Sequence, residues 1–213
     1  VVLLSSTIKF EGALIRQVET EGPLQTLVAQ ATDQRTLRGL ARWEGDVPAH
    51  ASLEQTFGAG RVVLTASAPG GERYQGVVAL EGASLAGALE SYFAQSEQLP
   101  TRLWLAADGR RATGLLLQRL PGRSEDDDTW PRAAVLADTL REDELLDLPA
   151  EPLLYRLFHE ERVRLFDAEP VSFRCGCSRE RIEGLLRSLG RDEVDAVLAD
   201  EGVVEVTCEF CNR

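Results

Sequence analysis

The residues best suited to chemistry are four cysteines, and all of them lie near the carboxyl end of the 213-residue chain. Cys175 and Cys177 flank Gly176, whereas two residues separate Cys208 from Cys211. Four thiolates make a complete tetrahedral ligand set for zinc. The Cys-x-x-Cys spacing lets two sulfurs bind one ion, and a glycine lets Cys-x-Cys turn tightly enough to do the same. We therefore expect one zinc ion per chain, with all four cysteines as its ligands.

Ordinary disulfides or buried free thiols are the alternative interpretation of the same residues. Secreted disulfide frameworks spread their cysteines through a small chain, whereas residues 1–174 contain none. We also find neither the apolar core of a signal peptide nor the run of about 20 apolar residues that spans a membrane. The clustering favours a metal module in a reducing compartment, so we expect a cytoplasmic protein with no membrane partner.

A site with four thiolate ligands offers redox chemistry rather than hydrolysis. It has no open position for water or substrate, so we do not expect an enzyme. Metal-bound cysteines stay in the thiolate form, which oxidants attack. Disulfide formation removes the negative ligands, and in small modules the metal-binding energy is also folding energy. The site therefore predicts a sensor that converts oxidation into local unfolding.

Composition excludes several other partners and sites. A net charge of −12 argues against a phosphate-binding surface and against anionic membranes. The only lysine, Lys9, lies in no glycine-rich phosphate loop, so we expect no ATP site. His50 and His159 lie far from every cysteine in the sequence, and we interpret them as surface imidazoles.

The elements that must position the cysteines predict an α+β fold with a mixed or antiparallel sheet. A helix is expected over 85–93, with an apolar stripe and Ser84 as its N-cap. Glu21-Gly22-Pro23 predicts the start of another helix that runs to about residue 31. Glu81-Gly82 precedes the first of these helices as Glu21-Gly22 precedes the second, and this likeness hints at a repeated strand–strand–helix unit. Strands are expected over 7–10, 14–19, 37–43, 61–66 and 74–80, followed by a hairpin of 103–106 and 113–119.

Composition divides the chain into a core domain of residues 1–121, a linker of residues 122–170 and a zinc module of residues 171–213. The linker begins with a charged run, which predicts a surface loop. Its short helices are marginal alone and need a surface to lie on. Linker helices are expected over 132–140, 143–148 and 152–159, with a strand over 163–166. Between the cysteine pairs we expect helices over 181–189 and 192–199, hinged at Gly190, and a strand over 203–206 after Gly202.

Several stretches resemble one known family over nearly the whole chain. The most specific are Cys175-Gly176-Cys177-Ser178-Arg179-Glu180-Arg181 and Cys208-Glu209-Phe210-Cys211. Others are residues 71–78, 80–82, 96–102 and 154–161. These are similar to the bacterial heat shock protein 33 family of redox-regulated molecular chaperones. The family's first stretch and its tail after the second cysteine pair have no counterpart here, so we expect the natural chain to extend further.

The resemblance implies a mechanism. The reduced, zinc-bound form would be an inactive monomer. Oxidation would join Cys175 to Cys177 and Cys208 to Cys211, release zinc and unfold the linker. The exposed apolar surface would then hold unfolding client proteins without ATP, usually as a homodimer. Residues 1–121 would supply the client-binding and dimerisation domain.

Two other functions remain open from the residues alone. A zinc module that binds nucleic acid would use its arginines, although acidic residues outnumber them within 171–213. A thiol–disulfide oxidoreductase would use Cys208 and Cys211, but such enzymes place this motif at a helix start, where the dipole lowers the thiol pKa. Here the motif follows a predicted strand, which disfavours this alternative.

Overall fold

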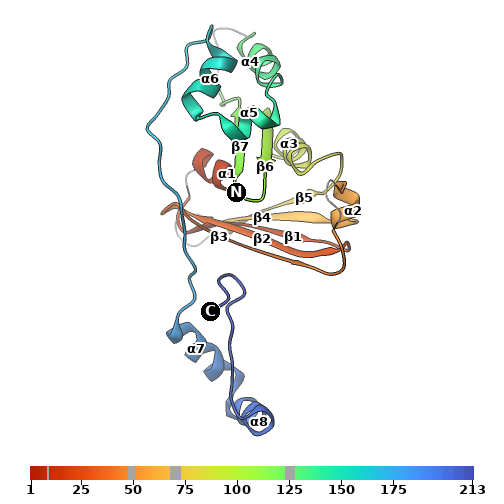
Figure 1. Cartoon of the computed structure of the whole chain (residues 1–213), viewed down its shortest axis with the longest axis vertical. Coiled ribbons are helices and arrows are strands. Elements are labelled where there is room, and N and C mark those ends of the chain that lie inside the picture. Colours follow the sequence, from red (N-terminus) through yellow and green to blue (C-terminus); the bar gives the residue numbers. More distant parts are fainter. Residues whose placement is uncertain (9, 48–50, 68–72, 123–127) are drawn as a thin grey trace.

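A computed structural model describes residues 1–8, 10–47, 51–67, 73–122 and 128–213. It confirms the α+β class, with a mixed sheet, covering helices and a four-cysteine cluster near the carboxyl end. Helices and a hairpin lie on one side of the sheet, and the cysteine module lies on the other side (Figure 1). Within the described residues, no helix is both long enough and apolar enough to cross a membrane.

The main sheet has six strands in the order β5-β4-β1-β2-β3-β8. All pairs are antiparallel except β3 with β8, which is parallel. This single parallel pair makes the sheet mixed. The strands are β1 (Ala13–Glu19), β2 (Leu24–Thr32), β3 (Thr36–Trp43), β4 (Arg61–Ser67), β5 (Arg73–Ala79) and β8 (Ser172–Phe173).

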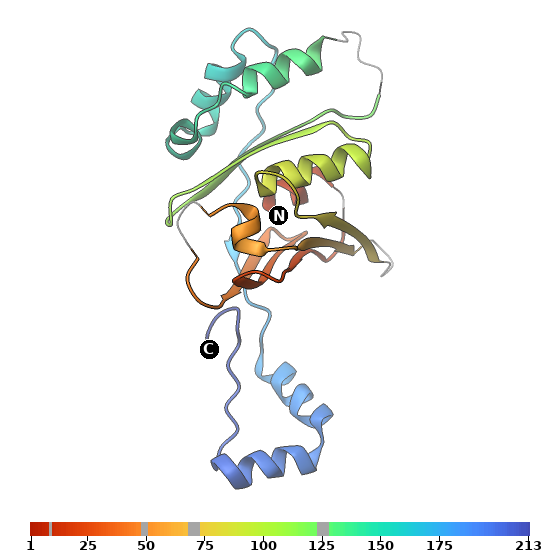
Figure 2. The same ribbon diagram turned by 90° about the vertical axis from the view of Figure 1, so that its right-hand side faces the viewer.

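One face of this sheet carries the first hydrophobic core. Val18, Val62 and Val78 lie side by side in register and are all buried, because alternate residues of a strand point to the same face. Helices α2 (Leu53–Phe57) and α3 (Leu85–Gln95) supply the covering side chains. Figure 2 shows α3 lying across that face, with α1 (Val2–Thr7) beside it.

A second core forms on the hairpin of β6 (Thr101–Ala107) and β7 (Ala112–Gln118). Three short helices cover it: α4 (Thr129–Ala137), α5 (Glu142–Asp147) and α6 (Ala150–Phe158). They bury Leu145, Leu153, Leu157 and Phe158 against hairpin residues that include Ala106 and Trp104. The expected short helices therefore do lie on an apolar surface.

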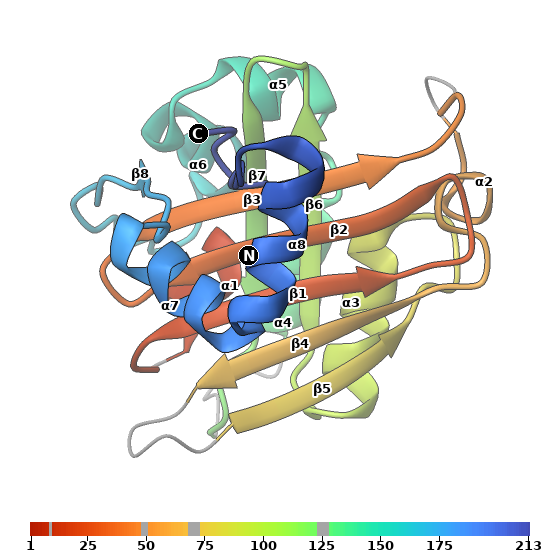
Figure 3. The same ribbon diagram turned by 90° about the horizontal axis from the view of Figure 1, so that it is seen from below.

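The chain after α6 has no regular structure from residue 162 to residue 171. It runs down beside the sheet to β8 and enters the cysteine module, which contains α7 (Arg179–Leu189) and α8 (Arg191–Glu201) (Figure 1). Seen from below, α7 and α8 project over β1, β2 and β3 (Figure 3).

Several sequence-based expectations were wrong. The helix expected up to residue 31 is strand β2. The strand expected over 7–10 does not form at its described residues, where helix α1 ends at Thr7, and Lys9 lies outside the described residues. The repeated strand–strand–helix unit is therefore absent. No strand forms over 163–166 or 203–206, and α2 was missed. His50 and the charged run at 123–127 lie outside the described residues.

Candidate metal centre

The first cysteine pair is delivered by the edge of the sheet. Strand β8 pairs with β3, and the flanking amides of Ser172 and Arg174 donate hydrogen bonds to the carbonyls of Arg35 and Leu37, both at 3.1 Å. Cys175 follows Arg174 directly, so its position is set by backbone hydrogen bonds to the core sheet. Cys175 is half-buried and Cys177 is exposed.

Gly176 lies beside a packed side chain rather than at an unusual dihedral angle. Its φ is not among the positive values in the described chain, so the turn does not depend on the backbone freedom of glycine that we expected it to use. Instead, the Arg181 guanidinium lies close to it and donates a hydrogen bond of 2.7 Å to the Gly176 carbonyl. A Cβ at this position would lie 3.1 Å from Arg181 Nη1, so a larger residue would displace the guanidinium.

Helices α7 and α8 return the chain to the first pair. Ser178 caps α7 by accepting a hydrogen bond from the Arg181 amide. Gly190 has a φ of 93° and separates the two helices, and Gly202 ends α8 in the left-handed conformation. The predicted hinge and stop are both confirmed. Glycine suits both positions because it adopts positive φ without a steric penalty.

The second pair lies in a tight turn at the end of the chain. The amides of Cys211 and Asn212 donate hydrogen bonds of 3.3 and 2.7 Å to the Cys208 carbonyl. The Cys208 amide donates one of 2.8 Å to the backbone oxygen of Arg213. Glu209 and Phe210 occupy the tip of this turn. Cys208 and Cys211 are both half-buried.

The four sulfurs form one cluster, in which all Sγ atoms lie within 4.8 Å of one another. Two close contacts cross between the pairs: Cys175 Sγ lies 3.4 Å from Cys208 Sγ, and Cys177 Sγ lies 3.5 Å from Cys211 Sγ. A zinc–sulfur bond of about 2.3 Å implies tetrahedron edges of roughly 3.8 Å. The cluster therefore has the size and donor set of a four-thiolate metal site.

The thiols also show the electrostatics of a site that needs a cation. The backbone amide of Cys177 and then the neighbouring thiols donate to the Cys175 sulfur, which lowers the Cys175 pKa to about 6. The hydrogen bonds that Cys177 makes to Cys175 and Cys211 raise its own pKa to about 12. One sulfur ionises at the expense of its neighbour, whereas a coordinated cation would let all four ionise.

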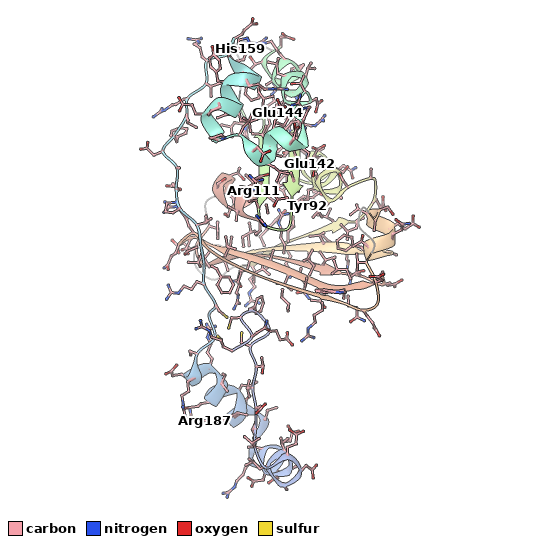
Figure 4. The ribbon with its side chains drawn as sticks, in the orientation of Figure 1. Tyr92, Arg111, Glu142, Glu144, His159 and Arg187 are labelled. Carbon is pink, nitrogen blue, oxygen red and sulfur yellow. The ribbon has the colours of Figure 1, made fainter. Side chains whose placement is uncertain are left out.

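The other residues considered in the sequence take no part in this cluster. His159 lies at the opposite end of the molecule, beside Tyr155 and Glu160 (Figure 4). Three arginines of the module are paired with acidic residues one helical turn away: Arg179 and Arg187 with Glu183, and Arg191 with Asp195. Such pairs belong to a solvated helix surface and do not form a phosphate-binding patch.

Sequence reasoning missed two residues that contact the second pair. Arg42 of β3 forms an ion pair with Glu209, and the Arg38 guanidinium lies 4.2 Å from the centre of the Phe210 ring. Both arginines lie more than a hundred residues from the turn in sequence. Only their spacing of four along a strand, which places them on one face, could have linked them to a common contact.

The sheet and the thiolate cluster define an α+β protein with a sensor module, and comparisons identify the family. The family model described as Hsp33 protein matches residues 1–213. The 33 kDa chaperonin of Nitrosococcus oceani is 60% identical over 212 residues, covering 100% of this chain and 73% of its own. That of Shewanella loihica is 48% identical, covering 99% of this chain and 73% of its own.

A solved structure shows the same fold. The crystal structure of the 33 kDa chaperonin from Thermotoga maritima matches with a TM-score of 0.85 and 22% identity, over 100% of this chain and 76% of its own. The chain belongs to the Hsp33 family. The protein is therefore a redox-regulated chaperone and not an enzyme, as the family resemblance implied.

Proposed function

We propose that the reduced protein holds one zinc ion through Cys175, Cys177, Cys208 and Cys211. The size and donor set of the sulfur cluster support this ligand set. When bound, zinc keeps the four sulfurs charged and holds the two ends of the module together. Free thiols rather than disulfides fit a reducing, cytoplasmic location.

One observation carries the proposal: the module has no hydrophobic core of its own. Helices α7 and α8 lie wholly within the described residues, and neither buries a side chain. Isolated helices of 11 residues are marginal in water. In small modules the metal supplies about 10–16 kcal/mol of folding energy. Order in residues 175–211 therefore depends on the four sulfurs keeping their charge.

Oxidation would proceed within each cysteine pair. One thiolate attacks peroxide, forming a sulfenic acid and releasing hydroxide, and its partner displaces a second hydroxide to form the disulfide. Two peroxides accept four electrons as Cys175 joins Cys177 and Cys208 joins Cys211. Although sulfurs of different pairs also lie in close contact, disulfides between the pairs would tie the two ends of the module together. Disulfides within the pairs let the ends separate, which a switch requires.

Release of the module would free the linker, which we place at residues 122–170 between a core of 1–121 and a sensor of 171–213. Its helices α4, α5 and α6 have nine, six and nine residues. They shield apolar hairpin residues such as Trp104, Leu115 and Leu117. Once uncovered, this surface and the linker's own leucines would bind the apolar segments of unfolding clients. Binding would need no ATP, and the active form would be a homodimer.

Metal content and thiol count before and after peroxide treatment test this proposal. The reduced protein should contain one zinc ion and four free thiols, and mild peroxide at elevated temperature should reduce both to zero. Only the oxidised form should suppress aggregation of a thermally unfolding enzyme. Reduced protein without metal, or equal chaperone activity in the two states, would contradict the proposal.

A further inference from the structure

Strand β3 contacts both segments of the chain that carry the cysteine pairs. Along its edge it pairs with β8, which leads directly into Cys175. On one face it presents Arg38 and Arg42 to the turn that carries Cys208 and Cys211. A single strand of the core sheet thus holds two cysteine pairs that lie far apart in the chain.

Arg42 holds the turn through its acidic residue. Its Nη2 atom forms an ion pair with Glu209 Oε1, and both side chains are about half exposed, at 54% and 52%. Glu209 follows Cys208 directly, so this contact restrains the backbone next to a cluster sulfur. At such exposure, one ion pair shifts a local equilibrium by up to about five-fold.

Arg38 holds the same turn through its aromatic residue. Its guanidinium carbon lies 4.2 Å from the centre of the Phe210 ring, which is the geometry of a cation–π contact. The guanidinium is itself oriented, because Nε donates a hydrogen bond of 2.7 Å to Gln30 Oε1 on β2. Arg38 also approaches the first pair: a Cβ on Gly176 would lie 3.7 Å from Arg38 Nη1.

We propose that Arg38 and Arg42 are positioning residues for the redox pair Cys208–Cys211. They hold the turn against Cys175 and Cys177, so their contacts set how often it opens and exposes its sulfurs to oxidant. Packing inside the module cannot do this, because α7 and α8 bury no side chain along their described lengths. The inference rests on the proposed function only in taking this cluster as the redox site.

Charge reversal tests the contact between Arg42 and Glu209. In the reduced, metal-loaded full chain, Arg42→Glu or Glu209→Arg alone should speed amide exchange at residues 208–213 by about two- to five-fold. Peroxide should consume the thiols of Cys208 and Cys211 faster by a similar factor. The double variant Arg42→Glu/Glu209→Arg restores opposite charges and should return both rates to within about two-fold of the parent.

Two substitutions, one that removes the cation and one that keeps it, test the contact between Arg38 and Phe210. Arg38→Ala removes the cation over the Phe210 ring and should raise both rates by about two- to five-fold. Arg38→Lys keeps a cation there, so both of its rates should lie between those of the parent and those of Arg38→Ala. Arg73→Glu is the matched control, because Arg73 is an exposed arginine on β5, at the opposite edge of the same sheet. It should change neither rate.

Unchanged rates in the single variants, or a double variant no slower than the singles, would overturn the positioning role. Circular dichroism spectra of the Arg42 and Glu209 variants should match the parent, because both side chains are exposed. These outcomes are separable from the proposed function. If the oxidised parent fails to protect an unfolding enzyme, the proposed function fails, whereas exchange at residues 208–213 in the reduced chain still reports whether the turn is docked.

Discussion

Arg35, in the turn between β2 and β3, binds Glu169 of the linker through two parallel hydrogen bonds. Arg35 Nε donates to Glu169 Oε2 at 2.8 Å, and Nη2 donates to Oε1 at 2.6 Å. Planar, two-point pairing of this kind restricts geometry more than a single charge contact does. It therefore fixes the extended chain against the sheet just before β8.

Glu169→Gln should loosen this part of the linker. The amide keeps the size of the carboxylate but cannot accept both guanidinium bonds, and exposed pairs contribute about 0.2–1 kcal/mol. We expect the amides of Ser172 and Arg174, which donate hydrogen bonds to β3 and the turn before it, to exchange faster in the reduced protein, by up to about five-fold. Amides in β6 and β7 should be unaffected, which serves as an internal control. Equal exchange at Ser172 and Arg174 would show that the pair does not hold the linker.

Cys208→Ser should unfold the module even without oxidant. If the four cysteines bind zinc as we propose, three sulfurs leave the ligand set incomplete and remove the metal-binding energy that would order α7 and α8. We expect loss of bound zinc and a drop in helical circular dichroism confined to that module. Ser178→Ala is a matched control, since it removes only the α7 cap, worth about 1 kcal/mol. A serine variant that retained its metal would contradict the assigned ligands.

Leu157→Ala should loosen the linker from the hairpin. Leu157 is only 2% exposed and packs in the second core, and such truncations cost about 2–5 kcal/mol. Urea denaturation should show this decrease in the free energy of unfolding. The variant should gain chaperone activity at a lower temperature or under milder oxidation than the parent. Tyr155→Ala, on the same helix but at a side chain 72% exposed, should cost about 0.5 kcal/mol or less. Equal effects of the two changes would argue against a docked linker.

Asp108 should make the hairpin sensitive to acid. Backbone amides of Arg110 and Arg111, and then the Arg111 side chain, donate to its carboxylate and lower its pKa from 3.8 to about 2. A lowered pKa stabilises the fold above the unfolded value, and this contribution disappears as pH falls through the folded value. Above about pH 5 the parent should have a higher melting temperature than Asp108→Asn. This gap in melting temperature should close as pH falls from about 4 to about 2. A gap independent of pH would rule out this carboxylate as the cause.

Sequence alone predicted the chemistry of the module but not its docking. The spacing of Cys175, Cys177, Cys208 and Cys211 predicted a single cluster, because four sulfur ligands on short loops have few other uses. The contacts of Arg38 with Phe210 and of Arg42 with Glu209 join residues distant in the chain. The sequence around Arg38 or Arg42 does not show whether the side chain contacts a distant residue or water.

The error at β2 has a physical cause. The start signal at Glu21-Gly22-Pro23 predicted a helix. The apolar residues Leu24, Leu27, Val28 and Ala31 also recur at helical spacing and do not contradict it. In the structure, β2 lies between β1 and β3 and exchanges backbone hydrogen bonds with both. Those neighbours decide the conformation, since tertiary context overrides local propensity. Ser84 and the stripe of α3 were predicted well because the helix needs no strand partner.

The unstructured segment at residues 162–171 also acts as a tether. While α6 stays docked on the hairpin, ten extended residues reach at most about 35 Å, so a sensor that leaves the sheet stays within that distance of the end of α6. Its return is intramolecular, with an effective concentration in the millimolar range for a short flexible chain. Recovery of the docked sensor after reductant is restored should therefore be first order, with a half-time that is the same in dilute and in concentrated protein.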